Sequence, residues 1–237
     1  MKSRATERPD YGQDAPYVMW WLGGSGLACL LVAFLLPVLQ FMVWPGVSLL
    51  VSAVFFVLGS RFGKPRLREK IMDSLKWSGD ERVLDVGCGS GLLLNAAAKR
   101  VPNGIAEGVD IWRKEDLANN GRETTERNAR LEGVLDRIRI TEADVRNLPF
   151  ENDTFDAAMS LNVLHNLSKR EDRRQALREI VRVVKPGGQL LMCDFRNVSE
   201  YVSDLRQLDV EDPTKQLMGW MGYMPMHAAV ARKTTHP

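Results

Sequence analysis

The residues best placed to do chemistry lie in one short segment, Asp85-Val86-Gly87-Cys88-Gly89-Ser90-Gly91, directly after the apolar pair Val83-Leu84. An apolar run that ends in an acid and three glycines predicts a buried strand, a tight turn and the start of a helix. Glycines let a backbone approach a ligand closely, and a helix N-terminus offers free N–H groups and a partial positive charge. The segment therefore predicts a site for a nucleotide-like cofactor.

Two features of this segment argue against a dinucleotide. Leu92 stands where the NAD fingerprint G-x-G-x-x-G has its third glycine. The carboxylate of Asp85 would repel a pyrophosphate, whereas it suits a cationic or amine-bearing ligand. The chain also has no G-x-x-x-x-G-K-[ST] segment, which excludes a P-loop.

The segment 85–91 resembles motif I, E/D-x-G-x-G-x-G, of the class I S-adenosylmethionine (SAM)-dependent methyltransferases. Three further segments resemble that family in the expected order. They are the strand end Gly108-Val109-Asp110-Ile111-Trp112, the segment Thr141-Glu142-Ala143-Asp144-Val145 that leads into 148–156, and the turn Val184-Lys185-Pro186-Gly187-Gly188. The lead 148–156 and this turn resemble the quinone-biosynthesis-like subgroup, and the matches together cover residues 78 to 197.

The resemblance implies SAM as the cofactor and assigns cofactor contacts to the matching residues. The amino-acid end of SAM would lie on Asp85 and the turn, and Asp110 would accept both ribose hydroxyls. Ile111 and Trp112 would stack on the adenine, Asp144 would accept from its amino group, and Asn162 would face the methyl group. The full set is Asp85, Gly87, Cys88, Gly89, Gly91, Asp110, Ile111, Trp112, Asp144, Val145 (through its backbone N–H) and Asn162.

His165 is the one candidate for a catalytic residue, in the segment Ser160–Leu167. A near-neutral imidazole could take a proton from a phenol or hydroxyl as the methyl group arrives. A histidine after a strand can equally cap or pack, and both roles stay open. The three cysteines, Cys29, Cys88 and Cys193, form no metal-binding spacing, so no metal site is expected.

The order of elements predicts an α/β fold without reference to any family. Apolar strands are expected at 83–86, 105–109, 137–141, 157–161 and 189–194, and helices at 91–100, 114–132 and 170–184. This alternation predicts a Rossmann-like, doubly wound, mostly parallel sheet with its ligand at the carboxyl ends of the strands.

The fold is expected to be of the seven-stranded methyltransferase type with a shortened C-terminal end. After a helix from Val198 to Leu208, only the segment from Asp212 to Pro237 remains for the usual antiparallel hairpin. The methionine-rich stretch 218–226 would form a truncated strand in the core or an adaptable apolar lid, and 227–233 the last strand.

The segment from Ala15 to Ser60 contains 46 positions without a charged residue or histidine. One membrane span takes about 20 residues, so the length suits two spans. Pro37, Pro45 and Gly46 mark the break between them. Tyr17, Trp20, Trp21 and Trp44 suit the membrane interfaces, and Gly23, Gly24 and Gly26 offer a small-residue packing face. A transmembrane hairpin is favoured over a buried soluble hairpin or a re-entrant insertion.

Four regions follow: an N-terminal tail (1–14), the membrane hairpin (15–60), a basic amphipathic linker helix (61–82) and the methyltransferase domain (83–237). The linker begins with five basic residues: Arg61, Lys64, Arg66, Arg68 and Lys70. By the positive-inside rule, both termini and the catalytic domain are expected in the cytoplasm.

The net charge is only +2, and no basic face interleaved with aromatic residues indicates a nucleic-acid partner. We expect a membrane-anchored methyltransferase that acts on a small or lipid-like acceptor at the cytoplasmic face, with the lipid bilayer as partner. A tethered methyltransferase for a soluble small molecule or protein, and a non-catalytic SAM-binding scaffold, are the alternatives. No feature of the sequence indicates an oligomeric state.

Overall fold

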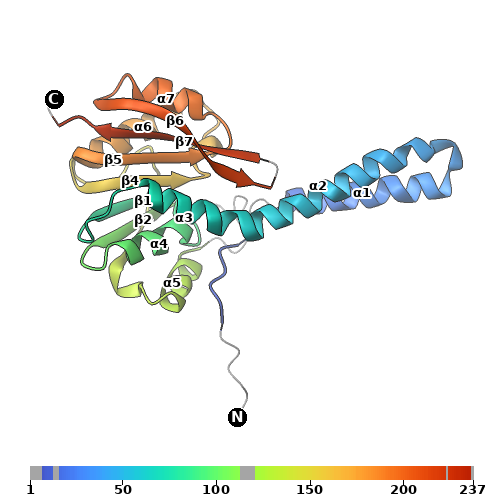
Figure 1. Ribbon diagram of the computed structural model, residues 1–237, viewed down its shortest axis with the longest axis horizontal. Coiled ribbons are helices and arrows are strands. Elements are labelled where there is room, and N and C mark those ends of the chain that lie inside the picture. Colours follow the sequence, from blue (N-terminus) through green and yellow to red (C-terminus); the bar gives the residue numbers. More distant parts are fainter. Residues whose placement is uncertain (1–6, 13–15, 113–120, 223, 236–237) are drawn as a thin grey trace, which may run out of the picture.

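The computed structural model describes residues 7–12, 16–112, 121–222 and 224–235. A rounded α/β domain carries a long helical hairpin that projects from one side (Figure 1).

A seven-stranded sheet forms the centre of the domain, in the order β3-β2-β1-β4-β5-β7-β6. The strands are β1 (Arg82–Val86), β2 (Ile105–Asp110), β3 (Ile138–Glu142), β4 (Phe155–Leu161), β5 (Val184–Asp194), β6 (Val210–Met221) and β7 (Met224–Lys233). The first five are parallel, and β7 is antiparallel to both β5 and β6. This confirms the Rossmann-like, doubly wound, mostly parallel sheet expected from the alternation of elements.

Helices cover both faces of the sheet. On one face, α3 (Lys64–Ser74), α4 (Leu92–Arg100) and α5 (Arg122–Leu131) pack against one apolar cluster. On the other, α6 (Arg170–Val183) and α7 (Val198–Leu205) pack against a second cluster. The central strand β1 is buried on both faces through Val83 and Leu84, which is why its sequence is almost continuously apolar. Two short 3₁₀ turns, η3 (Leu135–Arg137) and η4 (Leu164–Asn166), precede β3 and follow β4.

The expected boundaries hold within about two residues for the first four strands, but β5 begins earlier than 189. The pairing of β4 with β5 shifts register between Phe155 and Ala157, so the segment from Lys185 to Gly188 lies within the strand as an irregularity. Gly187 has a φ of 76°, which only glycine adopts without strain. The Pro-Gly-Gly segment therefore bends a continuous strand.

The expectation of a shortened C-terminal end is wrong. β6 contains 12 residues and β7 ten, and together they form a full antiparallel hairpin at the sheet edge. The preceding helix ends at Leu205, before the expected 208, and β6 starts at Val210. β6 is exposed at seven of its 12 positions, so its sequence lacks the apolar run that marks the other strands. Met218 and Met221 are core residues of β6, which agrees with the packing role for this stretch.

The projecting hairpin consists of α1 (Pro16–Leu35), the 3₁₀ turn η1 (Pro37–Met42) and α2 (Val43–Leu58). The segments Tyr17–Leu35 and Pro37–Ser74 are each long and apolar enough to cross a membrane. The break falls at Pro37 as expected, whereas Pro45 lies in the first turn of α2. The two helices lie close together at Gly26 and Gly46, since a Cβ on Gly46 would lie 3.1 Å from the Gly26 carbonyl oxygen. Gly23 and Gly24 face open space, so the small-residue face is limited to Gly26.

The linker helix is shorter than the expected 61–82. A π-helical turn, η2 (Gly59–Gly63), joins α2 to α3, which ends at Ser74. Gly79, with a φ of 102°, then turns the chain, and its N–H donates to the Glu81 carboxylate over 2.9 Å. The second apolar helix therefore continues directly into a helix whose Leu67, Ile71 and Met72 are buried in the catalytic domain.

Candidate cofactor and active site

The carboxyl ends of β1 and β2 bring the glycine turn and Asp110 together. The N–H groups of Gly87 and Cys88 donate to the Val109 carbonyl over 2.7 and 3.1 Å. The Gly89 N–H donates to Asp110 Oδ2 over 2.7 Å. Gly87, Gly89 and Gly91 have φ values of 72°, 49° and 88°, so all three positions require a left-handed backbone. The turn is thus fixed by hydrogen bonds to the neighbouring strand.

Two of the predicted contact residues have structural roles in this turn. A Cβ on Gly87 would lie 2.2 Å from Val163 Cγ2, so the missing side chain makes room for the loop after β4. The side chain of Cys88 is buried in the core beside Gly108, and burial raises the pKa of its thiol well above the usual range. Cys88 can therefore contribute backbone groups to a ligand site, but its side chain belongs to the core.

Asp85 is the most unusual carboxyl group in the site. It is 2% exposed, and its Oδ2 atom has no hydrogen-bond partner within the described chain. Burial, followed by the nearby negative charge of Asp110, raises its pKa to about 8 against an opposing backbone hydrogen bond from Leu94. An unpaired buried carboxyl oxygen is costly unless something binds there. A cationic amine, such as that of the SAM amino-acid group, would supply the missing partner, so these residues fit the implied cofactor.

Asp110 is held firmly at the end of β2. Its Oδ1 accepts from the Trp112 N–H over 2.6 Å, while Oδ2 accepts from Gly89. A carboxylate oxygen has two lone pairs, so ribose hydroxyls could still bind. Trp112 packs on the core, and its indole N–H donates to the Gly89 carbonyl over 3.3 Å. Ile111 is exposed and is the apolar side chain left open for stacking on adenine.

Helix α5 supports the glycine turn through two buried polar residues that the sequence analysis did not single out. The Thr125 hydroxyl donates to the Gly89 carbonyl over 2.5 Å, and Asn128 Nδ2 donates to the Ser90 carbonyl over 2.9 Å. Both side chains are fully buried. They occur among charged residues such as Arg122 and Glu126, which form an ion pair on the outer face of the helix.

Residues 10–12, within the segment expected as an N-terminal tail, form a strap over this support. Asp10 and Asn128 exchange two hydrogen bonds, N–H to Oδ1 over 3.0 Å and Nδ2 to the Asp10 carbonyl over 2.6 Å. The Tyr11 hydroxyl donates to Glu132 over 2.5 Å, and burial raises its pKa. Lys64 donates to the Gly12 carbonyl over 3.1 Å. The strap, residues 10–12, thus links the start of α3 to the helices beside the glycine turn.

Asp144 and Val145 lie at the end of β3, beyond Asp110, whose carbonyl accepts from the Ala143 N–H over 3.1 Å. The carboxylate of Asp144 binds Arg146 Nη2 over 2.5 Å and Nε over 3.0 and 3.1 Å, so the adenine amino group would share it with a guanidinium. The Val145 side chain is buried in the core, and within the described chain its N–H has no acceptor. That N–H is therefore a donor with which a ligand could pair.

Asn162 follows β4 with a left-handed φ of 58°. Its N–H donates to the Cys193 carbonyl over 3.0 Å, and its Oδ1 is buried without a partner among the described residues. The Nδ2 atom lies 4.0 Å from Met221 Sδ, at the tip of β6. The C-terminal hairpin therefore reaches the position expected for the methyl group.

His165 forms a pair with Asp194, which ends β5. His165 Nδ1 lies 2.6 Å from Asp194 Oδ1, and the His165 N–H donates to Oδ2 over 3.1 Å. Asp194 is 1% exposed and also accepts from the Phe195 N–H over 3.0 Å and the Tyr201 hydroxyl over 3.1 Å. The imidazole contacts the Phe195 ring edge-on, with centroids 4.6 Å apart. The sequence carried one signal for Asp194, an acid at the end of an expected strand.

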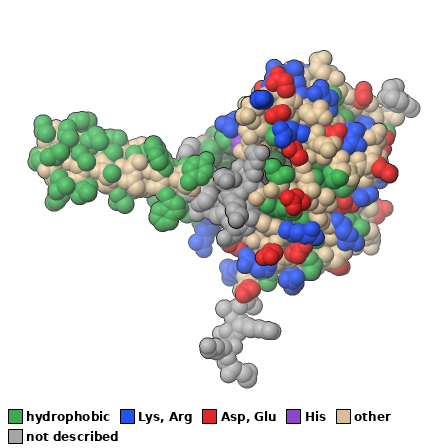
Figure 2. Space-filling model, turned by 180° about the vertical axis from the view of Figure 1, so that it is seen from behind, with side chains coloured by type: hydrophobic (Ala, Val, Ile, Leu, Met, Phe, Trp, Pro, Cys, Tyr) green, Lys and Arg blue, Asp and Glu red, His purple; other side chains and the backbone are tan. Residues whose placement is uncertain are grey.

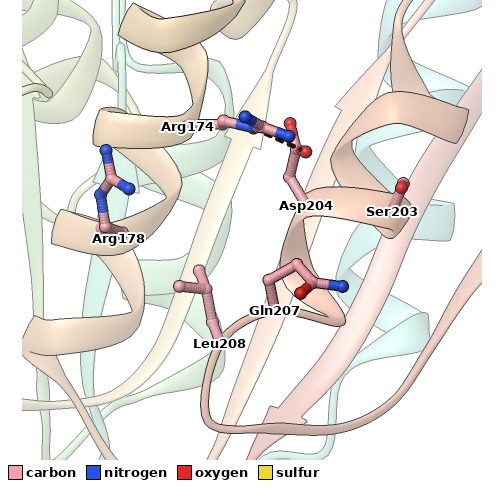
Figure 3. A pocket seen from close by; sticks show the side chains of 6 residues that line it. All are labelled: Arg174, Arg178, Ser203, Asp204, Gln207 and Leu208. Carbon is pink, nitrogen blue, oxygen red and sulfur yellow. Dashed lines mark hydrogen bonds and ion pairs between the residues drawn. The ribbon is translucent and has the colours of Figure 1, made fainter.

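A separate pocket of about 380 Å³ lies between α6 and α7 (Figure 3). Arg174 forms an ion pair with Asp204 across it, with Nε and Oδ1 2.9 Å apart. The other lining residues are Arg178, Ser203, Gln207 and Leu208. None of the expected site residues lines this pocket, so it is not the cofactor site.

Residues 84–192 match a family described as "Methyltransferase domain". The 2-phytyl-1,4-naphtoquinone methyltransferase of Nostoc punctiforme is 35% identical over 130 residues, 53% of this chain and 53% of that protein. The ubiquinone/menaquinone biosynthesis C-methyltransferase UbiE of Geobacter sulfurreducens is 32% identical over 131 residues, 55% of this chain and 48% of that protein. The chain thus spans about half the length of these curated relatives.

Among solved structures, the [4+2]-cyclase SpnF superimposes with a TM-score of 0.61 and 20% identity, covering 72% of this chain and 81% of that one. Likeness at this identity shows the fold alone. The match of residues 84–192 to a methyltransferase domain, together with the unpaired Asp85 carboxyl, indicates a SAM-dependent methyltransferase with S-adenosylmethionine as its cofactor.

Proposed function

We propose that the whole chain is a membrane-anchored methyltransferase that methylates a small or lipid-like acceptor at the cytoplasmic membrane face. The observation that carries this proposal is the position of the hairpin. Gly59, the first residue after α2, packs against Gly222 in the turn between β6 and β7. Met221, next to that turn, lies beside Asn162. The apolar helices therefore join the domain near Asn162, where we propose that methyl transfer takes place.

The side chains of the hairpin support a membrane location. Of the 18-residue apolar stretch within Tyr17–Leu35, only 11% is buried, and of that within Pro37–Ser74, only 17%. The core helix of a soluble protein would instead be mostly buried. Large apolar residues such as Trp20, Phe34 and Trp44 are exposed along its length. In Figure 2 the projecting hairpin shows hydrophobic side chains and tan atoms without charged side chains, in contrast to the catalytic domain, where charged side chains are frequent. Exposing such a surface to water is unfavourable, and a bilayer would cover it.

The names of two relatives support an acceptor with an apolar body. One is a phytyl-naphthoquinone methyltransferase, and the other belongs to ubiquinone and menaquinone biosynthesis. Acceptors of that chemistry dissolve in membranes. An anchored domain would meet them without extracting them into water.

In the proposed reaction, SAM supplies a methyl group on a sulfonium, which is a good leaving group. Asp85 and the glycine turn would bind its amino-acid end, Asp110 its ribose, and Asp144 with the Val145 N–H its adenine. Asn162 would lie beside the methyl group. Nδ1 of His165 lies 2.6 Å from Asp194 Oδ1 without hydrogen-bond geometry, and Nε2 is the nitrogen that we propose takes a proton from the acceptor.

Cofactor binding and anchoring can be tested separately. Calorimetry should detect SAM binding to the wild-type chain and a large loss of affinity in Asp110→Asn, because the amide would place a donor where Asp110 now accepts from Gly89 or Trp112. Unchanged binding would contradict the ribose role.

Alkaline carbonate should leave the full chain in the membrane pellet, and its release into the supernatant would contradict the transmembrane hairpin. Tags at the two ends should both be accessible from the cytoplasmic side.

A methylation assay distinguishes this proposal from two alternative hypotheses. A tethered enzyme for soluble small molecules or proteins would label those fractions instead of lipids. A SAM-binding scaffold would bind SAM and label neither.

A further inference from the structure

The catalytic end of the sheet faces the hairpin, and this follows from strand pairing. β7 is antiparallel to β5, with His227 opposite Asp194, so the carboxyl end of β5 lies near the start of β7. The start of β7 is Met224, two residues after Gly222, which touches the end of α2. Because β1 to β5 are parallel, all their carboxyl ends lie at this edge of the sheet, as Figure 1 shows.

The hairpin of β6 and β7 is fastened to the helix that leaves the apolar segment. A Cβ on Gly59 would lie 2.2 Å from the Gly222 nitrogen, and a Cβ on Gly63 would lie 3.1 Å from the Trp220 carbonyl oxygen. Lys70 donates to the Leu217 carbonyl over 3.0 Å. Residues 217–222 therefore lie along η2 and α3. These contacts fix their position relative to the helical hairpin of α1 and α2.

Three apolar side chains at this junction are exposed although they lie on folded elements. Phe62 is 51% exposed, Leu217 49% and Trp220 59%. They continue the apolar surface of α2, where Phe55 and Leu58 are also exposed. We call Phe62, Leu217 and Trp220 the docking tip. Amphipathic aromatic residues such as tryptophan favour the interface between hydrocarbon and headgroups.

Basic side chains surround the docking tip. Arg61, Arg66 and Lys70 are exposed on the same continuous helix. Within the described chain, Arg61 and Arg66 form no ion pair, whereas the nearby acids Glu69 and Asp73 bind Arg68 and Arg100. Unpaired cations beside an apolar surface complement an anionic headgroup layer.

We propose that the docking tip is a membrane-docking surface of the catalytic domain, and that its occupant is the anionic face of a lipid bilayer. The inference rests on the proposed function, since it requires the hairpin to span the same membrane. Along β6, Trp220 is exposed while its neighbour Met221 is buried beside Asn162. The docked strand therefore separates lipid from the methyl-transfer position by its own thickness. An acceptor with an apolar tail reaches the site from the bilayer along this strand.

Spin-label accessibility in reconstituted full-length protein tests the proposal. A nitroxide is attached through single substitutions Leu217→Cys and Trp220→Cys in a Cys29→Ala background; Cys88 and Cys193 are buried. Leu31→Cys, an exposed position in the second half of α1, reports hairpin insertion. Gln207→Cys is the matched aqueous control, because Gln207 is exposed beyond α7, just before β6 begins at the opposite end of the strand. The vesicles contain phosphatidylglycerol and phosphatidylcholine, or phosphatidylcholine alone.

We expect labels at 217 and 220 to collide several-fold more with oxygen than with a water-soluble nickel chelate, with the preference weaker in phosphatidylcholine alone. The label at 207 should show the reverse preference. Labels at 217 and 220 that behave like the label at 207, while position 31 lies in lipid, would overturn docking and leave the anchor intact. A label at 31 that behaves as aqueous would instead overturn the anchor.

Discussion

At the scale of residues, the pairing of His165 with buried Asp194 is the arrangement most directly tied to catalysis. Asp194 receives contacts from His165, Phe195 and Tyr201, so its position does not depend on a ligand. We predict that His165→Gln lowers kcat about 100-fold, the usual contribution of a general base. Asp194→Asn should lower kcat in the same direction, because the imidazole loses its anionic partner. The SAM dissociation constant should stay unchanged in both.

Tyr201→Phe is the control for this pair, since it removes one hydrogen bond to Asp194 and keeps the ring. Its kcat should stay close to wild type. If His165→Gln retains wild-type kcat at all pH values, the histidine only packs against Phe195.

The raised pKa of Asp85 predicts a pH dependence of stability. The pKa is about 8 in the folded chain and 3.8 as the ordinary value, so the folded state holds a proton that the unfolded state has lost. Stability should therefore fall as pH rises from about 4 to about 8, and level off above that range. Asp85→Asn removes this slope. Thermal midpoints of both proteins in detergent, measured between about pH 5 and pH 9, should diverge; parallel curves would refute the raised pKa.

The sequence was sufficient to place Asp85 and Asp110 at one end of the sheet, because both acids end apolar strands beside a glycine turn. It could not identify Asp194 as the partner of His165 or Tyr201 as a donor to Asp194, since these contacts arise only through the pairing of β4 with β5 and the packing of α7. Likewise, the role of Gly87 as room for Val163 depends on a tertiary contact.

At the scale of elements, α5 is the support of the glycine turn and the attachment of the N-terminal strap. Asn128 is fully buried and donates to the carbonyls of Ser90 and Asp10. We predict that Asn128→Ala destabilises the fold by about 1–3 kcal/mol, because buried carbonyls lose their donor, and weakens SAM binding as the turn loosens. Arg127→Ala, on the exposed face, should change neither. Thermal melts measure the loss of stability, and calorimetry measures the affinity for SAM. Equal effects of Asn128→Ala and Arg127→Ala would argue against a role of Asn128 in supporting the glycine turn.

The elements of the catalytic domain were largely predictable, and the exceptions have physical reasons. Strands buried on both faces, such as β1, have apolar runs that reveal them. β6 is an edge strand exposed on one face, and its pairing with β7 shifts register twice. Its sequence therefore shows only a weak alternation of apolar and polar residues. The strap was missed because its residues are polar, and polar residues near a terminus indicate order only through distant partners such as Asn128.

At the scale of the whole molecule, one continuous helical path joins the apolar hairpin to the catalytic domain. The contact of Gly59 with Gly222 fixes their relation. We predict that Gly59→Ala destabilises the chain by about 1–3 kcal/mol, because the added methyl group must displace backbone atoms of the turn. Gly23→Ala is the matched control on α1: it faces open space and should be neutral or stabilising. Equal thermal midpoints for both variants would show that the contact between Gly59 and Gly222 accommodates the added methyl group without loss of stability.

The most direct test of membrane-anchored methyl transfer uses the full chain reconstituted in vesicles with a total lipid extract and SAM labelled in its methyl group. We predict that the label enters the lipid-soluble fraction, that it does not enter protein, and that the transfer falls strongly in Asp110→Asn. Label found only in protein or in water-soluble molecules, or no transfer while calorimetry still shows SAM binding, would contradict the proposed function.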